Sequence, residues 1–196
     1  MKHVGIFLFD KMELLDFAGP YEVFSVASEL HDYQLFKVFA VSQGGQEITT
    51  VNGLRVAADY SFNNHPPIDL LIIPGGIGTR YEIDKEPVLT WLKHQYAASQ
   101  ITMSVCSGTR LLAKLDLLDN LEIITHHSVI SDVQRMAPRA IMKEGARFTD
   151  NGKILTAAGI SAGIDLSLYL VEKLYGKPAA DKTVVYMEYG DWEKRR

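Results

Sequence analysis

Cysteine is the residue that this sequence has least of. Cys106 is the single cysteine among 196 residues. One thiol cannot form an internal disulfide, and it excludes thiolate metal clusters and Cys-x-x-Cys redox pairs. A chain of this length can bury enough surface to fold without such cross-links. Cys106 is therefore either an inert core residue or a reactive group, and composition does not choose between them.

The sequence also lacks a strong charge of either sign and a long hydrophobic run. Its 20 basic and 24 acidic residues give a net charge of −4, which is not the signature of a nucleic-acid-binding protein. The basic end, 194–196, is short enough to be a solvated tail. No apolar run could span a membrane, and the apolar stretch 4–9 is not followed by a signal-peptide cleavage site. We expect a cytoplasmic protein with no nucleic-acid or membrane partner.

Apolar runs alternate with longer amphipathic runs along the chain. Strands are expected at residues 4–9, 34–41, 69–73, 101–105 and 122–125. Helices are expected at residues 21–30, 86–98, 107–114, 128–136, 161–174 and 179–189, with Pro20 in the first turn of the first one. Asn52-Gly53 and Asn151-Gly152 indicate two hairpins. The alternation predicts one α/β domain over residues 1–196, with a mostly parallel sheet covered by helices on both faces.

The strongest chemical signal lies at Cys106. A β-rich run, 101–105, meets a helix there, and Ser107-Gly108 follows. This order is typical of a nucleophile elbow, in which a sharp turn between strand and helix presents the reactive side chain at the sheet edge. The free N–H groups of the new helix would lower the pKa of the thiol and favour the thiolate. The alternative is that Cys106 is a small buried hydrophobe, as most free cysteines are.

A second candidate is the turn Pro74-Gly75-Gly76 after the strand at 69–73. Glycines let the backbone approach a ligand closely, and the N–H groups of Gly75 and Gly76 could line an oxyanion pocket. The turn lacks the Gly-Lys-Ser/Thr ending of a phosphate-binding loop. On its own it is also compatible with a simple tight turn.

Asp16 is a third candidate, because it interrupts an apolar stretch just before the expected first helix. Its alternative role is an N-terminal cap, which aspartate performs well. Glu22 falls inside the helix and is as compatible with a surface carboxylate.

Three polar residues in the second half remain. His126 and His127 follow the strand at 122–125, so they could reach the carboxyl edge of the sheet. Adjacent histidines are expected to point different ways, which makes a pocket wall a better role than a metal site. Asp165 lies inside an apolar helix and should have a buried partner.

Taken in order, these segments resemble the DJ-1/PfpI superfamily, and within it most closely the isonitrile hydratase branch. The matching motifs run from residues 15–24 through Ile73-Pro74-Gly75-Gly76 and Ser104-Val105-Cys106-Ser107-Gly108. They continue through 125–126, 158–165 and 187–189. The resemblance implies a flavodoxin-like three-layer α/β sandwich that forms a homodimer and acts on a small molecule.

The resemblance also implies roles for individual residues. Cys106 would be the nucleophile, Asp16 the acid that approaches the thiol, and Ser107 the hydroxyl residue of the hydratase branch. Gly75, Gly76 and His126 would contact the substrate. The implied activity is hydration of an isonitrile to an N-formyl amine through a thioimidate, which requires no metal or cofactor.

The sequence is also compatible with other functions. Peptidase-like members carry histidine directly after the cysteine, where this chain has Ser107, and a helix-turn-helix domain such as AraC-type regulators append is not expected in 196 residues. Ser104, His127 and the tail 190–196 depart from the hydratase pattern. A related thiol-dependent hydrolase, amidase or glyoxalase, a thiol oxidation sensor and a ligand-binding regulatory domain are the alternatives.

Overall fold

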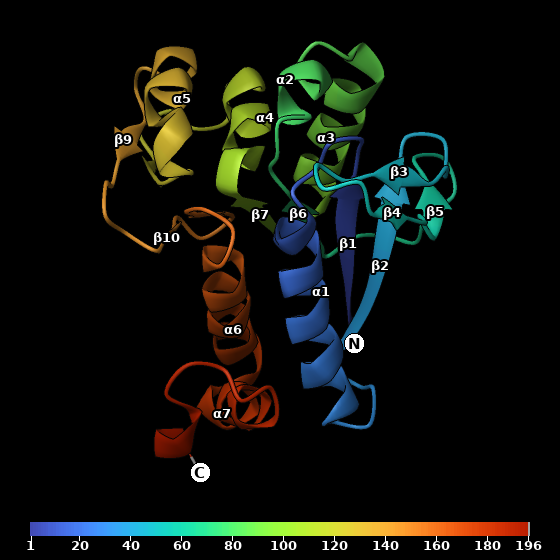
Figure 1. Cartoon of the computed structure of the whole chain (residues 1–196), viewed down its shortest axis with the longest axis vertical. Helices are drawn as coiled ribbons and strands as arrows, with labels where there is room; N and C mark the ends of the chain where they lie inside the picture. Colours follow the sequence, from blue (N-terminus) through green and yellow to red (C-terminus); the bar gives the residue numbers. More distant parts are fainter. Residues whose placement is uncertain (196) are drawn as a thin grey trace.

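A seven-stranded sheet forms the centre of the computed structural model, which describes residues 1–195 (Figure 1). The strand order is β10-β11-β7-β6-β1-β2-β5, and only the β10–β11 pair is antiparallel. These strands are β1 (Lys2–Leu8), β2 (Phe36–Ser42), β5 (Tyr60–Ser61), β6 (Leu70–Ile73), β7 (Ile101–Val105), β10 (Phe148–Asp150) and β11 (Ile154–Ala157). The mostly parallel sheet expected from the sequence is confirmed.

Helices cover both faces of the sheet, as expected. The helices are α1 (Leu14–Glu29), α2 (Thr79–Glu82), α3 (Glu86–Ala98), α4 (Thr109–Lys114), α5 (Ile130–Met136), α6 (Ala162–Tyr175) and α7 (Lys177–Tyr186). Helices α1, α6 and α7 pack on one hydrophobic core, and α3, α4 and α5 contribute to the other. Short 3₁₀ turns are η1 (Cys106–Gly108), η2 (His127–Val129) and η3 (Trp192–Arg195). This arrangement is the flavodoxin-like three-layer sandwich.

The start of the first helix differs from the sequence prediction. Helix α1 begins at Leu14, so Pro20 lies inside it and Asp16 lies in its first turn rather than at its cap. The Gly19-Pro20 signal reflects close packing instead. A Cβ atom on Gly19 would lie 2.9 Å from the side chain of Ile164 on α6, so only glycine lets the two helices approach this closely.

The expected strand at 122–125 lies outside the main sheet. It is the short strand β8 (Glu122–Ile123), which pairs with β9 (Ile141–Met142). Both edges of the nearby strand β11 are already paired, with β7 and with β10, and the Ile124 N–H after β8 donates to the Thr156 hydroxyl at 2.8 Å instead of to a strand of that sheet. The two expected hairpins are present, as β3 (Ile48–Thr49) with β4 (Arg55–Val56) and as β10 with β11.

Register brings the carboxyl ends of β1, β6 and β7 to one edge of the sheet. Ile72 on β6 lies opposite Ile6 on β1, and Ile73 lies opposite Ser104 on β7. The glycine turn after β6 and the cysteine after β7 therefore emerge side by side. This edge is where open α/β sheets bind their ligands.

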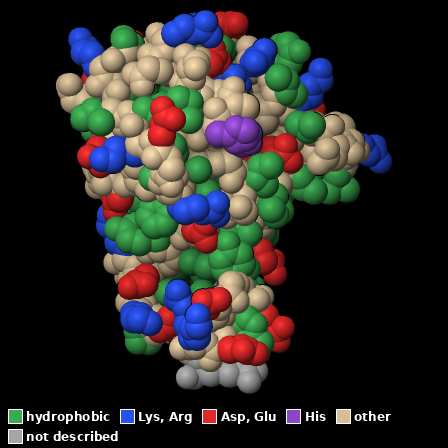
Figure 2. Space-filling view, turned by 60° about the vertical axis from the view of Figure 1, so that its left-hand side comes forward, with side chains coloured by type: hydrophobic (Ala, Val, Ile, Leu, Met, Phe, Trp, Pro, Cys, Tyr) green, Lys and Arg blue, Asp and Glu red, His purple; other side chains and the backbone are tan. Residues whose placement is uncertain are grey.

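The surface carries both signs of charge. Figure 2 shows Lys and Arg side chains interspersed with Asp and Glu over one face. At the end of the chain, Lys194 pairs with Asp191 and Arg195 pairs with Asp181, so the basic tail is partly held by ion pairs. Arg196 lies outside the described residues. Within residues 1–195, the helices are all too short or too polar to cross a bilayer.

Candidate active site

Cys106 lies at a sharp turn between β7 and the helical segment η1–α4. Its φ of +57° is in the left-handed region, which a residue with a side chain rarely adopts. The surrounding structure holds it there through its backbone groups. The Cys106 N–H donates to the Ala158 carbonyl at 3.0 Å, and the Cys106 carbonyl accepts from the Thr125 hydroxyl at 2.7 Å. The nucleophile elbow expected from the sequence is thus present.

Gly108 allows the elbow to pack against the neighbouring strand. A Cβ atom at this position would lie 2.2 Å from the Ile73 carbonyl oxygen. Any other residue would push η1 away from the end of β6. The glycine two positions after the cysteine therefore has a steric cause.

Asp16 reaches the same place from the first turn of α1. The residue is fully buried, and its Oδ2 accepts a hydrogen bond from the Gly75 N–H at 2.9 Å. Its Oδ1 is also buried and makes no hydrogen bond of regular geometry. Burial raises the pKa of Asp16 from 3.8 to about 7, although the Gly75 N–H opposes the shift. Asp16 can therefore hold or release a proton near neutral pH.

The Cys106 thiol does not have the lowered pKa that the sequence predicts. Burial and, to a smaller extent, the adjacent Asp16 carboxylate raise its pKa from 9.0 to about 12. The N–H groups of Ile160 and Ser107 hydrogen-bond to the sulfur and lower the pKa, but burial outweighs them. The prediction of a resting thiolate was wrong because only 6% of Cys106 is exposed. Between about pH 7 and about pH 12, Asp16 and Cys106 together therefore retain one proton.

The glycine turn is engaged by protein atoms rather than open to a ligand. The Gly75 N–H is bound by Asp16, and the Gly76 N–H donates to the Ser107 Oγ at 2.9 Å. The Ser107 hydroxyl in turn donates to the Gly76 carbonyl at 3.1 Å. The expectation that both N–H groups face the substrate therefore differs from the resting geometry. The turn instead positions Asp16 and Ser107 against the elbow.

Ile160 is a site residue that the sequence reading missed. Its φ is +44°, a strained conformation for a β-branched side chain, and its N–H donates to the Cys106 sulfur. No local motif announces this geometry, because isoleucine in a left-handed conformation has no sequence signal. The left-handed turn at Ile160, in the loop between β11 and α6, is where the N–H that reaches the thiol lies.

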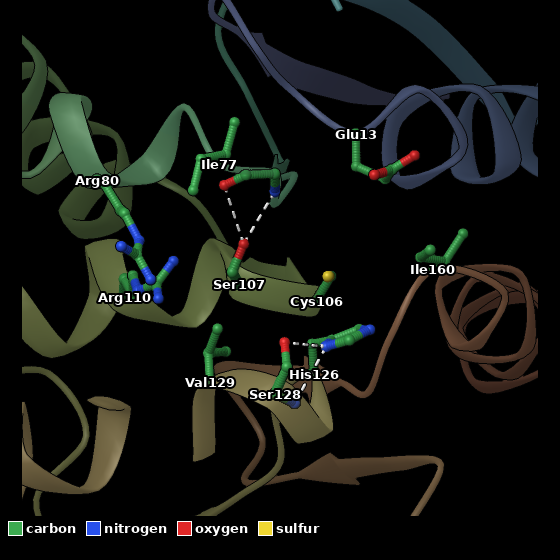
Figure 3. Close-up of a pocket in the computed structure, with 11 residues that line it drawn as sticks. Glu13, Ile77, Arg80, Cys106, Ser107, Arg110, His126, Ser128, Val129 and Ile160 are labelled. Atoms are coloured by element: carbon green, nitrogen blue, oxygen red, sulfur yellow. Dashed lines mark hydrogen bonds between the residues drawn. The ribbon is translucent and has the colours of Figure 1, made fainter. Parts of the chain in front are cut away.

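Cys106 opens onto a pocket of about 360 Å³ (Figure 3). Ser107 and Gly76 line it, as does His126 from the turn before η2. It is also lined by residues that the sequence did not predict to be part of a site, which are Glu13, Ile77, Arg80, Arg110, Ser128, Val129 and Ile160. The charged residues of this pocket could not be predicted from a sequence motif. They come from three separate segments, α2, α4 and the loop before α1, which only the fold brings together.

His126 forms one wall of the pocket beside its neighbour His127. The two rings lie 4.3 Å apart between centroids with a 34° tilt, so the expectation that they point different ways was wrong. The two rings contact each other in a tilted arrangement at the start of the 3₁₀ turn η2. The His126 Nδ1 accepts from the Ser128 N–H at 3.2 Å, and burial and His127 lower the pKa of His126. Residues 1–195 contain no group of three or more acidic, histidine or cysteine side chains able to hold a metal.

Two other acidic residues lie away from the thiol. Glu22 is exposed on α1. Asp165 accepts hydrogen bonds from Tyr189 at 2.8 Å and from the Arg147 Nε at 2.7 Å. The partner expected for Asp165 is present, although the pair is only partly buried.

The fold and the site together define a class of protein: a flavodoxin-like α/β sandwich with a cysteine at a nucleophile elbow and a carboxylate beside it. The model of the DJ-1/PfpI family matches residues 2–173, and the chain belongs to this family.

Named relatives differ in function. The chain is 26% identical over 186 residues to an isonitrile hydratase from Pseudomonas putida, covering 95% of this chain and 78% of that protein. It is 27% identical over 174 residues to the HTH-type transcriptional regulator GbdR from Pseudomonas aeruginosa, covering 89% of this chain and 47% of that protein. The chain thus spans about half the length of this regulator.

Solved structures agree on the fold. A ThiJ/PfpI family protein from Pseudomonas syringae superposes with a TM-score of 0.87 at 25% identity, over 96% of this chain and 75% of that one. DJ-1beta from Drosophila melanogaster superposes with a TM-score of 0.82 at 17% identity, over 96% and 98% of the two chains.

Proposed function

We propose that the protein is a thiol-dependent enzyme that hydrates an isonitrile to an N-formyl amine. The observation that carries the proposal is the pairing of a strained, buried Cys106 with an Asp16 whose pKa is about 7. A base whose pKa lies near the working pH is best suited to move a proton in both directions. The similarity to the isonitrile hydratase from Pseudomonas putida supports the choice of substrate class.

In the first step, the Asp16 carboxylate takes the thiol proton as the sulfur attacks the terminal carbon of the isonitrile. A carbon–sulfur bond forms, and Asp16 returns the proton to the same carbon. The product is a thioimidate, in which the former isonitrile carbon is bonded to hydrogen, nitrogen and sulfur. The thiol needs no standing negative charge, because the base beside it acts only when the electrophile is bound.

In the second step, water adds to the thioimidate carbon. Asp16 takes a proton from the water and delivers it to nitrogen, which gives a tetrahedral intermediate. The carbon–sulfur bond then breaks as the hydroxyl oxygen forms the formyl group. The hydroxyl proton returns to the Asp16–Cys106 pair, and an N-formyl amine leaves.

Ser107 and the N–H groups at the thiol stabilise charge during these steps. The Ser107 and Ile160 N–H groups already donate to the sulfur, so they favour the thiolate as it forms and leaves. The Ser107 hydroxyl exchanges its contact with Gly76 for one with the substrate. His126 forms the pocket wall on the other side of Cys106.

The experiment is to incubate the protein with cyclohexyl isocyanide and measure N-cyclohexylformamide. Turnover in the unaltered protein and none in Cys106→Ala is the expected result. Methylglyoxal serves as a parallel substrate for the glyoxalase alternative, with lactate as its product. Product from the isonitrile in Cys106→Ala would overturn the thiol mechanism.

A ligand-binding regulatory domain is the second candidate. It is favoured by the 27% identity to the transcriptional regulator over 89% of this chain. Saturable binding of a small molecule without turnover would support it. The oxidation-sensor alternative is weakened, because a sensor needs an exposed thiol of low pKa and Cys106 has neither property.

The proposal includes a homodimer in the cytoplasm, as the resemblance implies. Light scattering during gel filtration should give twice the chain mass of 21.9 kDa. A mass of one chain would overturn the dimer without affecting the proposed chemistry.

A further inference from the structure

The pocket at Cys106 contains a buried cation whose hydrogen bonds are incomplete. The Arg110 side chain on α4 is 2% exposed. Its Nε donates to the Asp132 carboxylate at 2.7 Å, and its Nη1 donates to the Thr79 hydroxyl at 3.2 Å. Its Nη2 is buried and has no partner among the described residues. Arg110 lines the pocket, and one buried N–H edge of its guanidinium is therefore left without a hydrogen bond within residues 1–195.

An unpaired charged donor in a protein interior is costly. A buried polar group without a partner loses its hydration and gains no hydrogen bond in exchange. Replacing Arg110 by an apolar side chain would remove that cost from the core. The arginine is better explained by a ligand that completes its hydrogen bonds.

A second arginine lies at the same wall. Arg80 on α2 is exposed and lines the pocket, and no ion pair is present for it among residues 1–195. Figure 3 shows its guanidinium group beside that of Arg110. Asp132, the counter-charge of Arg110, is shared with Arg135. Two arginine side chains therefore line the same wall, and Arg110 shares its one carboxylate partner, Asp132, with Arg135.

The other side of the pocket has the opposite character. Glu13 lines it, and Cys106 lies between Glu13 and the arginines in the view of Figure 3. Burial and His127 lower the pKa of His126, which favours the neutral imidazole and reduces the positive charge on this side. A molecule with one negative end is therefore oriented with that end toward Arg80 and Arg110 and its remainder over the thiol.

We propose that the pocket selects a small electrophile that carries a carboxylate, held by Arg110 and Arg80 while its reactive carbon lies at Cys106. A carboxylate offers two oxygens to the fork of a guanidinium group. A doubly charged phosphate would meet stronger repulsion from Glu13 and Asp16. The nature of the electrophile rests on the proposed function. The substrate would then be an isonitrile that also carries a carboxylate group.

Alkylation of the sole cysteine tests the subsite without requiring hydration. Iodoacetate and iodoacetamide differ only in a carboxylate against a neutral amide. The single mass increment that is absent from Cys106→Ala reports reaction at Cys106. The ratio of the iodoacetate rate to the iodoacetamide rate should be about tenfold higher in the native protein than in the urea-unfolded chain. An equal ratio in the two states would overturn the subsite.

Variants assign the effect to the arginines. Arg80→Gln, at an exposed position, and Arg110→Gln should each lower the ratio toward the unfolded value. Arg135→Gln is the matched control, because it also removes a partner of Asp132 but lies outside the pocket. If Arg110→Gln does not fold, Arg80→Gln and the unaltered protein still decide the question. A ratio in Arg80→Gln equal to that of Arg135→Gln would overturn the proposal.

A binding measurement covers the case in which Cys106 resists both reagents. Propionate should raise the Tm of Cys106→Ser, and propionamide should not. Equal effects of the two compounds would overturn the subsite. Retained carboxylate selectivity without turnover of either cyclohexyl isocyanide or an isonitrile that carries a carboxylate would contradict the proposed function alone. Turnover of cyclohexyl isocyanide without carboxylate selectivity would contradict the subsite alone.

Discussion

The Asp16 Oδ2 accepts a hydrogen bond from the Gly75 N–H at 2.9 Å, although 59 positions separate the two residues in sequence. This bond ties the first turn of α1 to the turn after β6. It fixes the carboxyl group at the carboxyl edge of the sheet, beside Cys106. The reactivity of the thiol therefore depends on a contact between two distant segments.

Asp16→Asn should stabilise the protein at neutral and alkaline pH. The pKa of Asp16 is raised to about 7 in the folded state, so the unfolded chain releases this proton more easily. The native carboxyl group contributes fully below about pH 4, and that contribution is lost as the pH rises to about 7. The variant should gain roughly 2–4 kcal/mol in free energy of unfolding at pH 8 and nothing at pH 3. Urea titrations at both pH values measure this, and a gain that is equal at pH 3 and pH 8 would contradict the raised pKa.

Alkylation of Cys106 by iodoacetamide should accelerate as the pH rises through about 7. Below this pH, Asp16 is protonated and cannot accept the thiol proton, and above it the carboxylate acts as the base. Asp16→Asn should lack this step and react appreciably only at more alkaline pH, because burial still raises the pKa of the thiol. Rates from intact mass between pH 5 and pH 10 test this. The same midpoint in both proteins would show that Asp16 does not control the thiol.

Gly75→Ala should abolish isonitrile turnover and lower stability by about 1–3 kcal/mol. The new Cβ would lie 2.5 Å from the Ser107 nitrogen and 2.8 Å from the Asp16 Oδ2, so the carboxylate must move. Gly44→Ala is the matched control, since its Cβ would meet the flexible side chain of Gln46. Denaturant unfolding and product formation should separate the two variants. Full activity in Gly75→Ala would show that the position of Asp16 is not critical.

Ile160→Asn should raise the free energy of unfolding by about 1 kcal/mol relative to Ile160→Val. Asparagine tolerates the left-handed conformation at φ +44°, whereas valine is as strained as isoleucine. Both variants keep the N–H that donates to the sulfur, so the pH profile of Cys106 alkylation should not change. Parallel urea titrations give the comparison. Equal stability of the two variants would mean that the strain at this position is not stored as folding free energy.

The fold class could be predicted from the sequence because it depends on local patterns. Apolar runs of strand length alternating with amphipathic runs leave few arrangements besides a parallel sheet between helices. The same patterns located the elbow at Cys106, where a buried strand meets Ser107 and Gly108, and the turn at Gly75 and Gly76. These signals are contiguous in sequence, and their structures follow from backbone geometry.

Tertiary structure alone decided the chemistry at the elbow. The N-terminal position of Cys106 on a helix favours a low pKa, but the pKa depends on the sum of burial and charge from all neighbours, and burial by distant segments prevails. The N–H of Ile160 comes from a loop and the unpaired Nη2 of Arg110 from a helix. No sequence motif connects either group to the thiol. The sequence determined that a cysteine would lie at the edge of a parallel sheet. Packing between segments far apart in the chain determined that it rests as a protonated thiol, with Asp16 as its base and two arginines in the wall of its pocket.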